Sequence, residues 1–264
     1  MRSNVQEGLG GNVYYNGLPK GCQLCYRGKK LVVFLTGLCP LNCFYCPIGS
    51  ERKGVDRTYA NERPVKDIIE ICEEGELMDA EGAGITGGEP LVKPLKVIQV
   101  IRCLKDHFGE RFHIHLYTSG ITLGRRVLEK IVKAGLDELR IHTFDVKFLN
   151  EKKPILEEFK DTIDIGLELP VIPGWKNKIV SIIESASDVI SFVNLNELEF
   201  SETNSLALLS RGFTLKRGSM ATANGSYETG LYVIDQLIEK FNLKIHLCTV
   251  VYKNGFQTTL RYFR

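Results

Sequence analysis

The chain has 264 residues, of which 44% are hydrophobic and 25% are charged, and its formal net charge is +2. This is the composition of an ordinary globular protein with one large domain or two small ones, and with enough chain for a buried core. The small net charge does not favour nucleic acid as a partner. A local basic patch from Lys216, Arg217, Arg261 and Arg264 keeps that alternative open.

No stretch approaches the roughly 18 consecutive apolar residues of a membrane-spanning helix. Residues 1–7 also lack the apolar core of a signal peptide. We therefore expect no membrane contact and a cytoplasmic location. In a reducing compartment the eight cysteines do not form a disulfide framework. Five of them fall within residues 22–46, and this clustering favours metal chemistry.

Residues 1–29 are predicted to form an irregular extension, because glycines punctuate them, with a short edge strand at 13–15. The extension contains Cys22-Gln23-Leu24-Cys25. Such a pair can be half of a zinc site, a redox pair, two ligands of an iron–sulfur cluster, or two thiols that bind nothing. A second metal site would need further ligands, and Cys248 and His246 near the other end of the chain are the candidates.

From residue 30 onward, strands and helices alternate. Strands are predicted at 31–35, 112–117, 138–142, 167–172, 192–198 and 244–250, and a further strand is predicted to end at Ile85-Thr86. Helices are predicted at 65–72, 95–108, 123–134, 150–162, 178–190 and 232–241. The first six strand–helix units have short connections, so they predict a parallel sheet with right-handed crossovers.

The predicted strands have one apolar face and one polar face. His113, His115 and Tyr117 share the polar face of strand 112–117, and Asn194 and Asn196 share the polar face of strand 192–198. A flat parallel sheet that is covered on both sides would be apolar throughout. The polar faces therefore favour the inside of a partial barrel that holds a polar ligand, with function at the carboxyl ends of the strands.

The first of these ends carries Cys39-Pro40-Leu41-Asn42-Cys43-Phe44-Tyr45-Cys46. Three thiols this close suit soft metals, above all iron–sulfur clusters and zinc. A four-iron cluster with three protein ligands leaves one iron open to a small molecule. The alternative is a structural zinc site with Cys22 or Cys25 as its fourth ligand.

The next strand ends in a second motif, Gly87-Gly88-Glu89-Pro90. Glycines let the backbone turn sharply and approach a ligand closely, and Glu89 offers a carboxylate to an ammonium group. The two motifs, in this order and at this spacing, resemble the radical SAM superfamily. Within it, the chain is most similar to pyruvate formate-lyase activating enzymes and their relatives.

The resemblance implies an α/β fold, a partial (βα)6 barrel at residues 30–200, between the N-terminal extension 1–29 and a C-terminal extension 201–264 packed on the core. It implies that Cys39, Cys43 and Cys46 bind a 4Fe–4S cluster whose remaining iron binds S-adenosylmethionine. Reductive cleavage of that cofactor would give a 5′-deoxyadenosyl radical. The radical would then take hydrogen from a substrate that the sequence does not identify.

The resemblance also implies contacts with the cofactor. Tyr45 would lie near the adenine, and Gly87, Gly88 and Glu89 near the methionyl amino group. The other candidate contacts come from the ends of later strands: Thr118, Ser119, Arg140, His142 and Asn196. For Arg140, an internal ion pair with Glu168 is the alternative.

Two other functions remain open. One is activation of a glycyl-radical protein, although Tyr117-Thr118-Ser119-Gly120 stands where such activating enzymes usually have Asp-Thr-Asn-Gly. The other is a non-catalytic iron–sulfur or zinc protein. The expected partners of the enzyme are an electron donor, such as a ferredoxin or flavodoxin, and a substrate that could itself be a protein.

Overall fold

The structure, a computed structural model, describes residues 4–257 and 259. In this part of the chain one 11-stranded sheet has the order β1-β2-β11-β10-β9-β8-β7-β6-β3-β4-β5. Its parallel strands are β3 (Lys30–Phe34), β6 (Gly82–Thr86), β7 (His113–Thr118), β8 (Glu138–Ile141), β9 (Asp164–Val171), β10 (Phe192–Glu197) and β11 (Lys244–Cys248). The antiparallel strands are β1 (Val5–Glu7) and β2 (Val13–Tyr15) beyond β11, and β4 (Thr58–Ala60) and β5 (Arg63–Val65) beyond β3.

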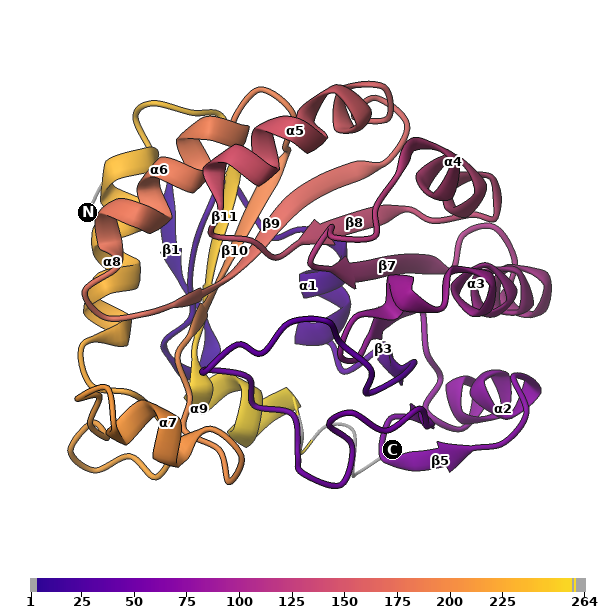
Figure 1. The fold of residues 1–264 in the computed structure, drawn as a ribbon, viewed down its shortest axis with the longest axis horizontal. Helices are drawn as coiled ribbons and strands as arrows, with labels where there is room; N and C mark the ends of the chain where they lie inside the picture. The colour runs from indigo at the N-terminus through magenta and orange to yellow at the C-terminus, as the bar shows by residue number, and fades with distance from the viewer. Residues whose placement is uncertain (1–3, 258, 260–264) are drawn as a thin grey trace.

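The longer helices cover the outside of this curved sheet, as Figure 1 shows. They are α2 (Ile69–Leu77), α3 (Pro94–Phe108), α4 (Arg125–Lys133), α5 (Val146–Glu157), α6 (Lys176–Ala186) and α8 (Ser226–Leu237). The shorter ones are α1 (Lys20–Tyr26), α7 (Ser205–Leu209), α9 (Val250–Tyr252), η1 (Leu9–Gly11), η2 (Pro90–Val92) and η3 (Lys253–Gln257). The predicted partial barrel is confirmed, and the parallel β11 adds a strand to it.

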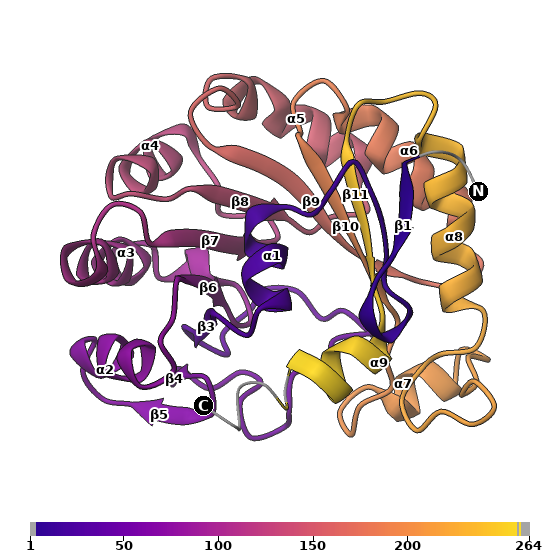
Figure 2. The same cartoon turned by 180° about the vertical axis from the view of Figure 1, so that it is seen from behind.

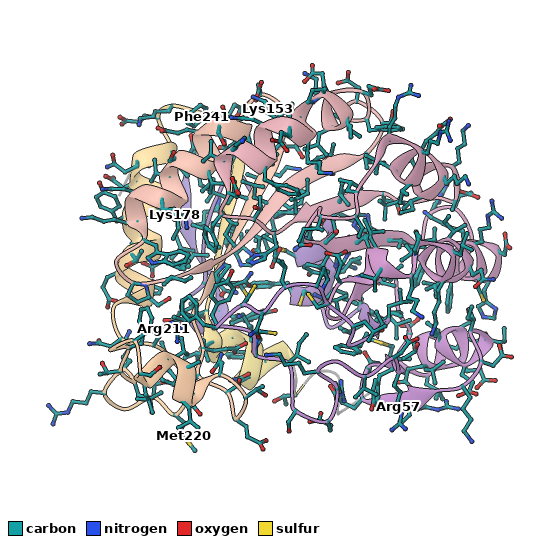
Figure 3. The ribbon with its side chains drawn as sticks, viewed as in Figure 1. Arg57, Lys153, Lys178, Arg211, Met220 and Phe241 are labelled. Carbon is teal, nitrogen blue, oxygen red and sulfur yellow. The ribbon has the colours of Figure 1, made fainter. Side chains whose placement is uncertain are left out.

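The core lies between the sheet and the outer helices, where side chains fill the space (Figure 3). The outward-facing strand residues, including Ile114, Leu116, Leu139, Leu167 and Val193, are fully buried there. Removal of this apolar surface from water is the main force that holds the helices on the sheet.

The inner face of the barrel is polar, as the alternation predicts. The Arg140 guanidinium lies 2.5 Å from Glu138 Oε1 and 2.9 Å from Glu168 Oε2. Asn194 and Asn196 donate to Glu168 Oε1 at 2.5 and 2.6 Å. The alternative of an ion pair between Arg140 and Glu168 is therefore confirmed.

Helix α1 was not predicted, because residues 1–29 were expected to be irregular. It lies inside the ring of strands, at the side of the barrel opposite the cysteine loop (Figures 1 and 2). Leu24 of α1 is fully buried, and Gly21 donates its backbone N–H to Glu138 Oε2 at 3.2 Å. A Cβ on Gly21 would stand 2.8 Å from both Arg140 and His115. The N-terminal extension thus closes one end of the barrel.

Some element boundaries differ from the prediction. Residues 63–65 pair with β4 as β5, so α2 begins at Ile69 rather than at residue 65. Helix α5 begins at Val146, because the Asp145 side chain accepts the backbone N–H of Phe148 and caps it. Strand β2 is present at 13–15, but it lies between β1 and β11 and not at the edge of the sheet.

Two further expectations concern the ends of the chain. Both extensions join the same sheet as the core, so the three-part domain division stays a prediction. None of the described helices combines the length and the apolar character needed to cross a bilayer. Arg261 and Arg264 of the basic patch lie outside the described residues.

The interior ion pairs predict a large cost for Arg140→Met. The change leaves Glu138 and Glu168 buried without their cation, which typically costs about 3–5 kcal/mol. We expect a loss of this size in the free energy of unfolding, measured by urea denaturation. The control is Arg125→Met, which removes an exposed pair with Glu158 and should change stability little. Equal losses in the free energy of unfolding for the two variants would contradict the placement of Arg140 in the barrel interior.

Candidate active site

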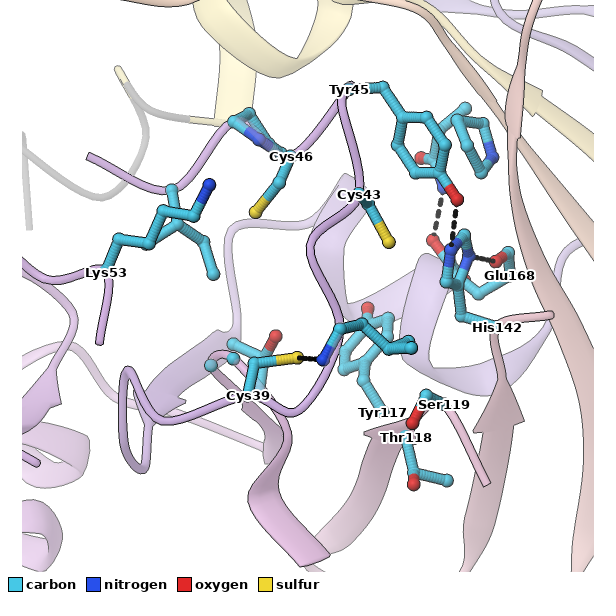
Figure 4. A pocket seen from close by; sticks show the side chains of 18 of the residues that line it. Cys39, Cys43, Tyr45, Cys46, Lys53, Tyr117, Thr118, Ser119, His142 and Glu168 are labelled. Carbon is cyan, nitrogen blue, oxygen red and sulfur yellow. Dashed lines mark hydrogen bonds between the residues drawn. The ribbon is translucent and has the colours of Figure 1, made fainter. Parts of the chain in front are cut away.

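A pocket of about 350 Å³ lies at the carboxyl ends of the strands. Cys39, Cys43 and Cys46 line it from one side, and Gly87 and Gly88 line it from the end of β6. Figure 4 shows the three cysteines around the same part of the pocket. The two sequence motifs therefore meet at one site, as predicted.

The cysteine loop has no regular secondary structure, and hydrogen bonds shape it. Leu41 N–H donates to Cys39 Sγ at 3.4 Å, and Cys46 N–H donates to the carbonyl of Cys43 at 3.1 Å. Burial raises the pKa of the Cys39 and Cys43 thiols, so a bound metal must displace their protons. The three sulfurs are not gathered as tightly as the ligands of a single ion.

The glycines of the second motif allow the two motif segments to pack against each other. Gly88 N–H donates to the carbonyl of Thr36, and Glu89 N–H to that of Leu38, both at 2.8 Å. A Cβ on Gly87, which has φ +145°, would stand 2.3 Å from Thr36 O, and a Cβ on Gly88 would stand 2.5 Å from Leu38 O. Side chains at either position would push the cysteine loop away from β6.

The Glu89 carboxylate is fully buried and holds the end of β6 against the end of β7. Oε1 accepts from Leu91 N–H at 3.0 Å and from the Thr118 hydroxyl at 2.7 Å. Oε2 accepts from Ser119 N–H at 2.6 Å and also from the Ser119 hydroxyl. Protein donors thus engage both oxygens, and a contact between Glu89 and a methionyl ammonium stays a prediction.

Tyr45 is held against the barrel by His142. The Tyr45 hydroxyl lies 3.0 Å from His142 Nε2, and His142 Nδ1 lies 3.0 Å from the carbonyl of Glu168 (Figure 4). Because a carbonyl only accepts, Nδ1 carries the proton and Nε2 accepts from Tyr45. Burial lowers the pKa of His142, which keeps the ring neutral and preserves this arrangement.

Most of the predicted cofactor contacts line the pocket: Tyr45, Gly87, Gly88, Thr118, Ser119, His142 and Asn196. Glu89 and Arg140 do not line it. Sequence reasoning missed Lys53 and Lys253, which line the pocket from segments without a recognisable motif.

A second, inner cavity of about 200 Å³ lies deeper in the barrel. It shares Tyr117, Glu168, Asn196 and Lys253 with the pocket. Its other lining residues include Cys22, Cys25, Arg140, His246 and Cys248. The structure therefore brings the N-terminal cysteine pair next to the two ligand candidates from the other end of the chain.

Among the described residues, one group has its ligand atoms close enough for a single ion: His113, His115 and Glu138, within 4.8 Å of one another. The Arg140 guanidinium already neutralises Glu138, and Gly21 N–H also donates to that carboxylate. A divalent ion here would face Arg140 at close range in a buried site, so the charges disfavour it.

An open groove of about 550 Å³ borders the pocket. Phe144, Phe148 and Trp175 give it aromatic walls, and Tyr45 and His142 belong to both spaces. Lys178 lies over the Trp175 ring at 4.2 Å and adds a positive charge at the rim. The groove offers a path by which an extended partner could reach the pocket.

Comparison with known proteins agrees with this geometry. Residues 33–184 match the family model described as "Radical SAM superfamily". A protein of Methanocaldococcus jannaschii named "Putative glycyl-radical enzyme activating enzyme" is 40% identical over 253 residues, covering 92% of this chain and 66% of that protein. A "Probable GTP 3′,8-cyclase" of Saccharolobus islandicus is 26% identical over 82% of this chain and 66% of that protein.

Among solved structures, SuiB of Streptococcus suis, in a crystal structure with S-adenosylmethionine bound, superposes with a TM-score of 0.53. The match covers 85% of this chain and 48% of SuiB at 13% identity, so it concerns the fold alone. This chain spans about two thirds of the length of the relatives from Methanocaldococcus jannaschii and Saccharolobus islandicus.

The contact between the motif segments predicts that Gly88→Ala displaces the cysteine loop. We expect binding of S-adenosylmethionine, measured by equilibrium dialysis of the reconstituted protein, to weaken by at least about tenfold, which corresponds to about 1.4 kcal/mol. The matched control is Gly124→Ala, since a Cβ there meets nothing within 4 Å. Wild-type binding by Gly88→Ala would show that the contact does not position the site.

Proposed function

Because the chain belongs to the radical SAM superfamily, we propose that it is an enzyme that reductively cleaves S-adenosylmethionine at a 4Fe–4S cluster. The 5′-deoxyadenosyl radical that the bound cofactor supplies would abstract hydrogen from a substrate. The observation that carries the proposal is the meeting of three thiols and Gly87-Gly88 in one pocket at the carboxyl ends of the strands.

The residues present fit the two groups. Cys39, Cys43 and Cys46 form a set of soft donors, which suits iron–sulfur ligation. Gly87 and Gly88 line the pocket with backbone, and their lack of side chains lets the segment of the cysteine loop pack against the end of β6. Thr118 and Ser119 present further polar groups from the end of β7, although their hydroxyls also bind Glu89.

Other residues would orient the cofactor and exclude water. Tyr45, fixed by His142, forms an aromatic wall on which an adenine could stack. Lys53 and Lys253 would place positive charge near a carboxylate. No catalytic acid or base is assigned, because hydrogen abstraction requires neither.

The direct test is anaerobic reconstitution with iron and sulfide, followed by reduction and addition of S-adenosylmethionine. We expect 5′-deoxyadenosine, detected by chromatography, and an iron–sulfur absorption band. Cys43→Ala should lose both, because one iron loses its ligand.

The control for this test is Cys72→Ala, since Cys72 is buried between α2 and α3, outside the barrel. It should retain cluster and product. If the wild-type protein binds no S-adenosylmethionine and forms no product, the chain is a non-catalytic iron–sulfur or zinc protein instead.

Activation of a glycyl-radical protein is the second candidate function. It is favoured by the name of the 40% identical relative and by the groove beside the pocket, which has room for a segment of a partner protein. An electron donor such as a ferredoxin or flavodoxin is then the second partner. A cytoplasmic location stays a prediction from the sequence.

This second function predicts a stable organic radical on a partner. The reduced enzyme and S-adenosylmethionine would be incubated with each glycyl-radical protein of the same organism, and the mixture examined by electron paramagnetic resonance. A glycyl doublet that Trp175→Ala weakens would support activation through the groove. Cleavage of S-adenosylmethionine without a doublet on any such protein would exclude activation and leave the first proposal intact.

A further inference from the structure

We propose that the inner cavity holds a second iron–sulfur cluster, ligated by Cys22, Cys25 and Cys248 with His246 as the fourth ligand. This second cluster goes beyond the proposed function, because cleavage of S-adenosylmethionine requires only the cluster on the cysteine loop. It starts from residues that are more than two hundred positions apart in the sequence and line one cavity.

The four ligands arrive as two pairs on regular elements. Cys22 and Cys25 are three residues apart on α1, so they share one face of the helix. His246 and Cys248 are two residues apart on β11, so they share the inner face of the strand. All four are buried, and rigid elements on both sides fix their positions. Both pairs line the same cavity.

His246 gives an independent sign of a missing ligand. Its side chain is 2% exposed, and neither ring nitrogen has a hydrogen-bond partner among the described residues. A buried polar group without a partner is destabilising, because it has given up its hydrogen bonds to water. A nitrogen that binds a metal no longer carries that cost, and imidazole is a common metal ligand.

The charged residues that line the cavity are three cations and one carboxylate, Glu168, which pairs with Arg140, and this balance suits an anionic cluster. Arg140 Nη1 and Nη2 lie 3.5 and 3.4 Å from Cys22 Sγ, close enough to donate hydrogen bonds to that sulfur. Lys30 and Lys253 also line the cavity. Iron–sulfur clusters with thiolate ligands are negatively charged, and donors to their sulfurs stabilise them.

Size and spacing favour a cluster over zinc. The cavity volume of about 200 Å³ is several times the roughly 30 Å³ that one water molecule occupies. The ligand atoms of the four residues are not gathered within 4.8 Å, as around one ion. The sulfur atoms of Cys39, Cys43 and Cys46 are likewise not gathered within 4.8 Å of one another. The inner cavity adjoins the pocket, because Tyr117, Glu168, Asn196 and Lys253 line both.

The test removes the first cluster and counts what remains. The triple variant Cys39→Ala, Cys43→Ala, Cys46→Ala would be reconstituted anaerobically with iron and sulfide. We expect it to keep about half of the wild-type iron and sulfide, with a paramagnetic signal after reduction. Adding Cys22→Ala should remove that iron, whereas adding Cys72→Ala should not.

A second measurement tests the proposal if the triple variant folds poorly. In the otherwise wild-type chain, Cys248→Ala should lower the iron content by about half, while Cys72→Ala retains all of it. Three results would overturn the proposal: no iron in a folded triple variant, zinc in place of iron, or full iron in Cys248→Ala. None of them bears on cleavage of S-adenosylmethionine, so the two proposals fail separately.

Discussion

The buried Glu89 carboxylate is the interaction on which the site depends. Its own N–H binds the carbonyl of Leu38, and its side chain binds Thr118 and Ser119. One residue therefore joins the carboxyl ends of β3, β6 and β7, which are adjacent in the sheet. The segments that follow these strands form the cysteine loop and the walls of the pocket. Charge-assisted hydrogen bonds of this kind are stronger than neutral ones, and burial strengthens them further.

Charge pairing inside the barrel sets where ligands can bind. Arg140 is neutralised by Glu138 and Glu168, and Asn194 and Asn196 occupy the other oxygen of Glu168. This network lines the inner cavity, and its members Glu168 and Asn196 also line the outer pocket, so the two spaces are adjacent. The polar interior thus has two compartments, each with its own set of thiols, and α1 forms the closed end.

The sequence was sufficient to predict the parallel barrel and the meeting of the two motifs, because apolar runs locate strands and the carboxyl ends of parallel strands share one edge. It did not predict α1, since a seven-residue helix that contains Gly21 shows no periodicity and is held by tertiary packing of Leu24. The engagement of Glu89 by Ser119 also escaped prediction, because it depends on which strands are neighbours. Alternation assigned Arg140 to the inner face, but only the fold places it below the pocket.

The central claim is that S-adenosylmethionine binds the open iron of the cluster held by Cys39, Cys43 and Cys46, beside Gly87-Gly88. Electron–nuclear double resonance of the reduced protein tests it most directly, with cofactor carrying a heavy nitrogen isotope in its amino group. The account predicts a hyperfine coupling between that nitrogen and the cluster. A reduced cluster that shows no such coupling, in the presence of saturating cofactor, would contradict it.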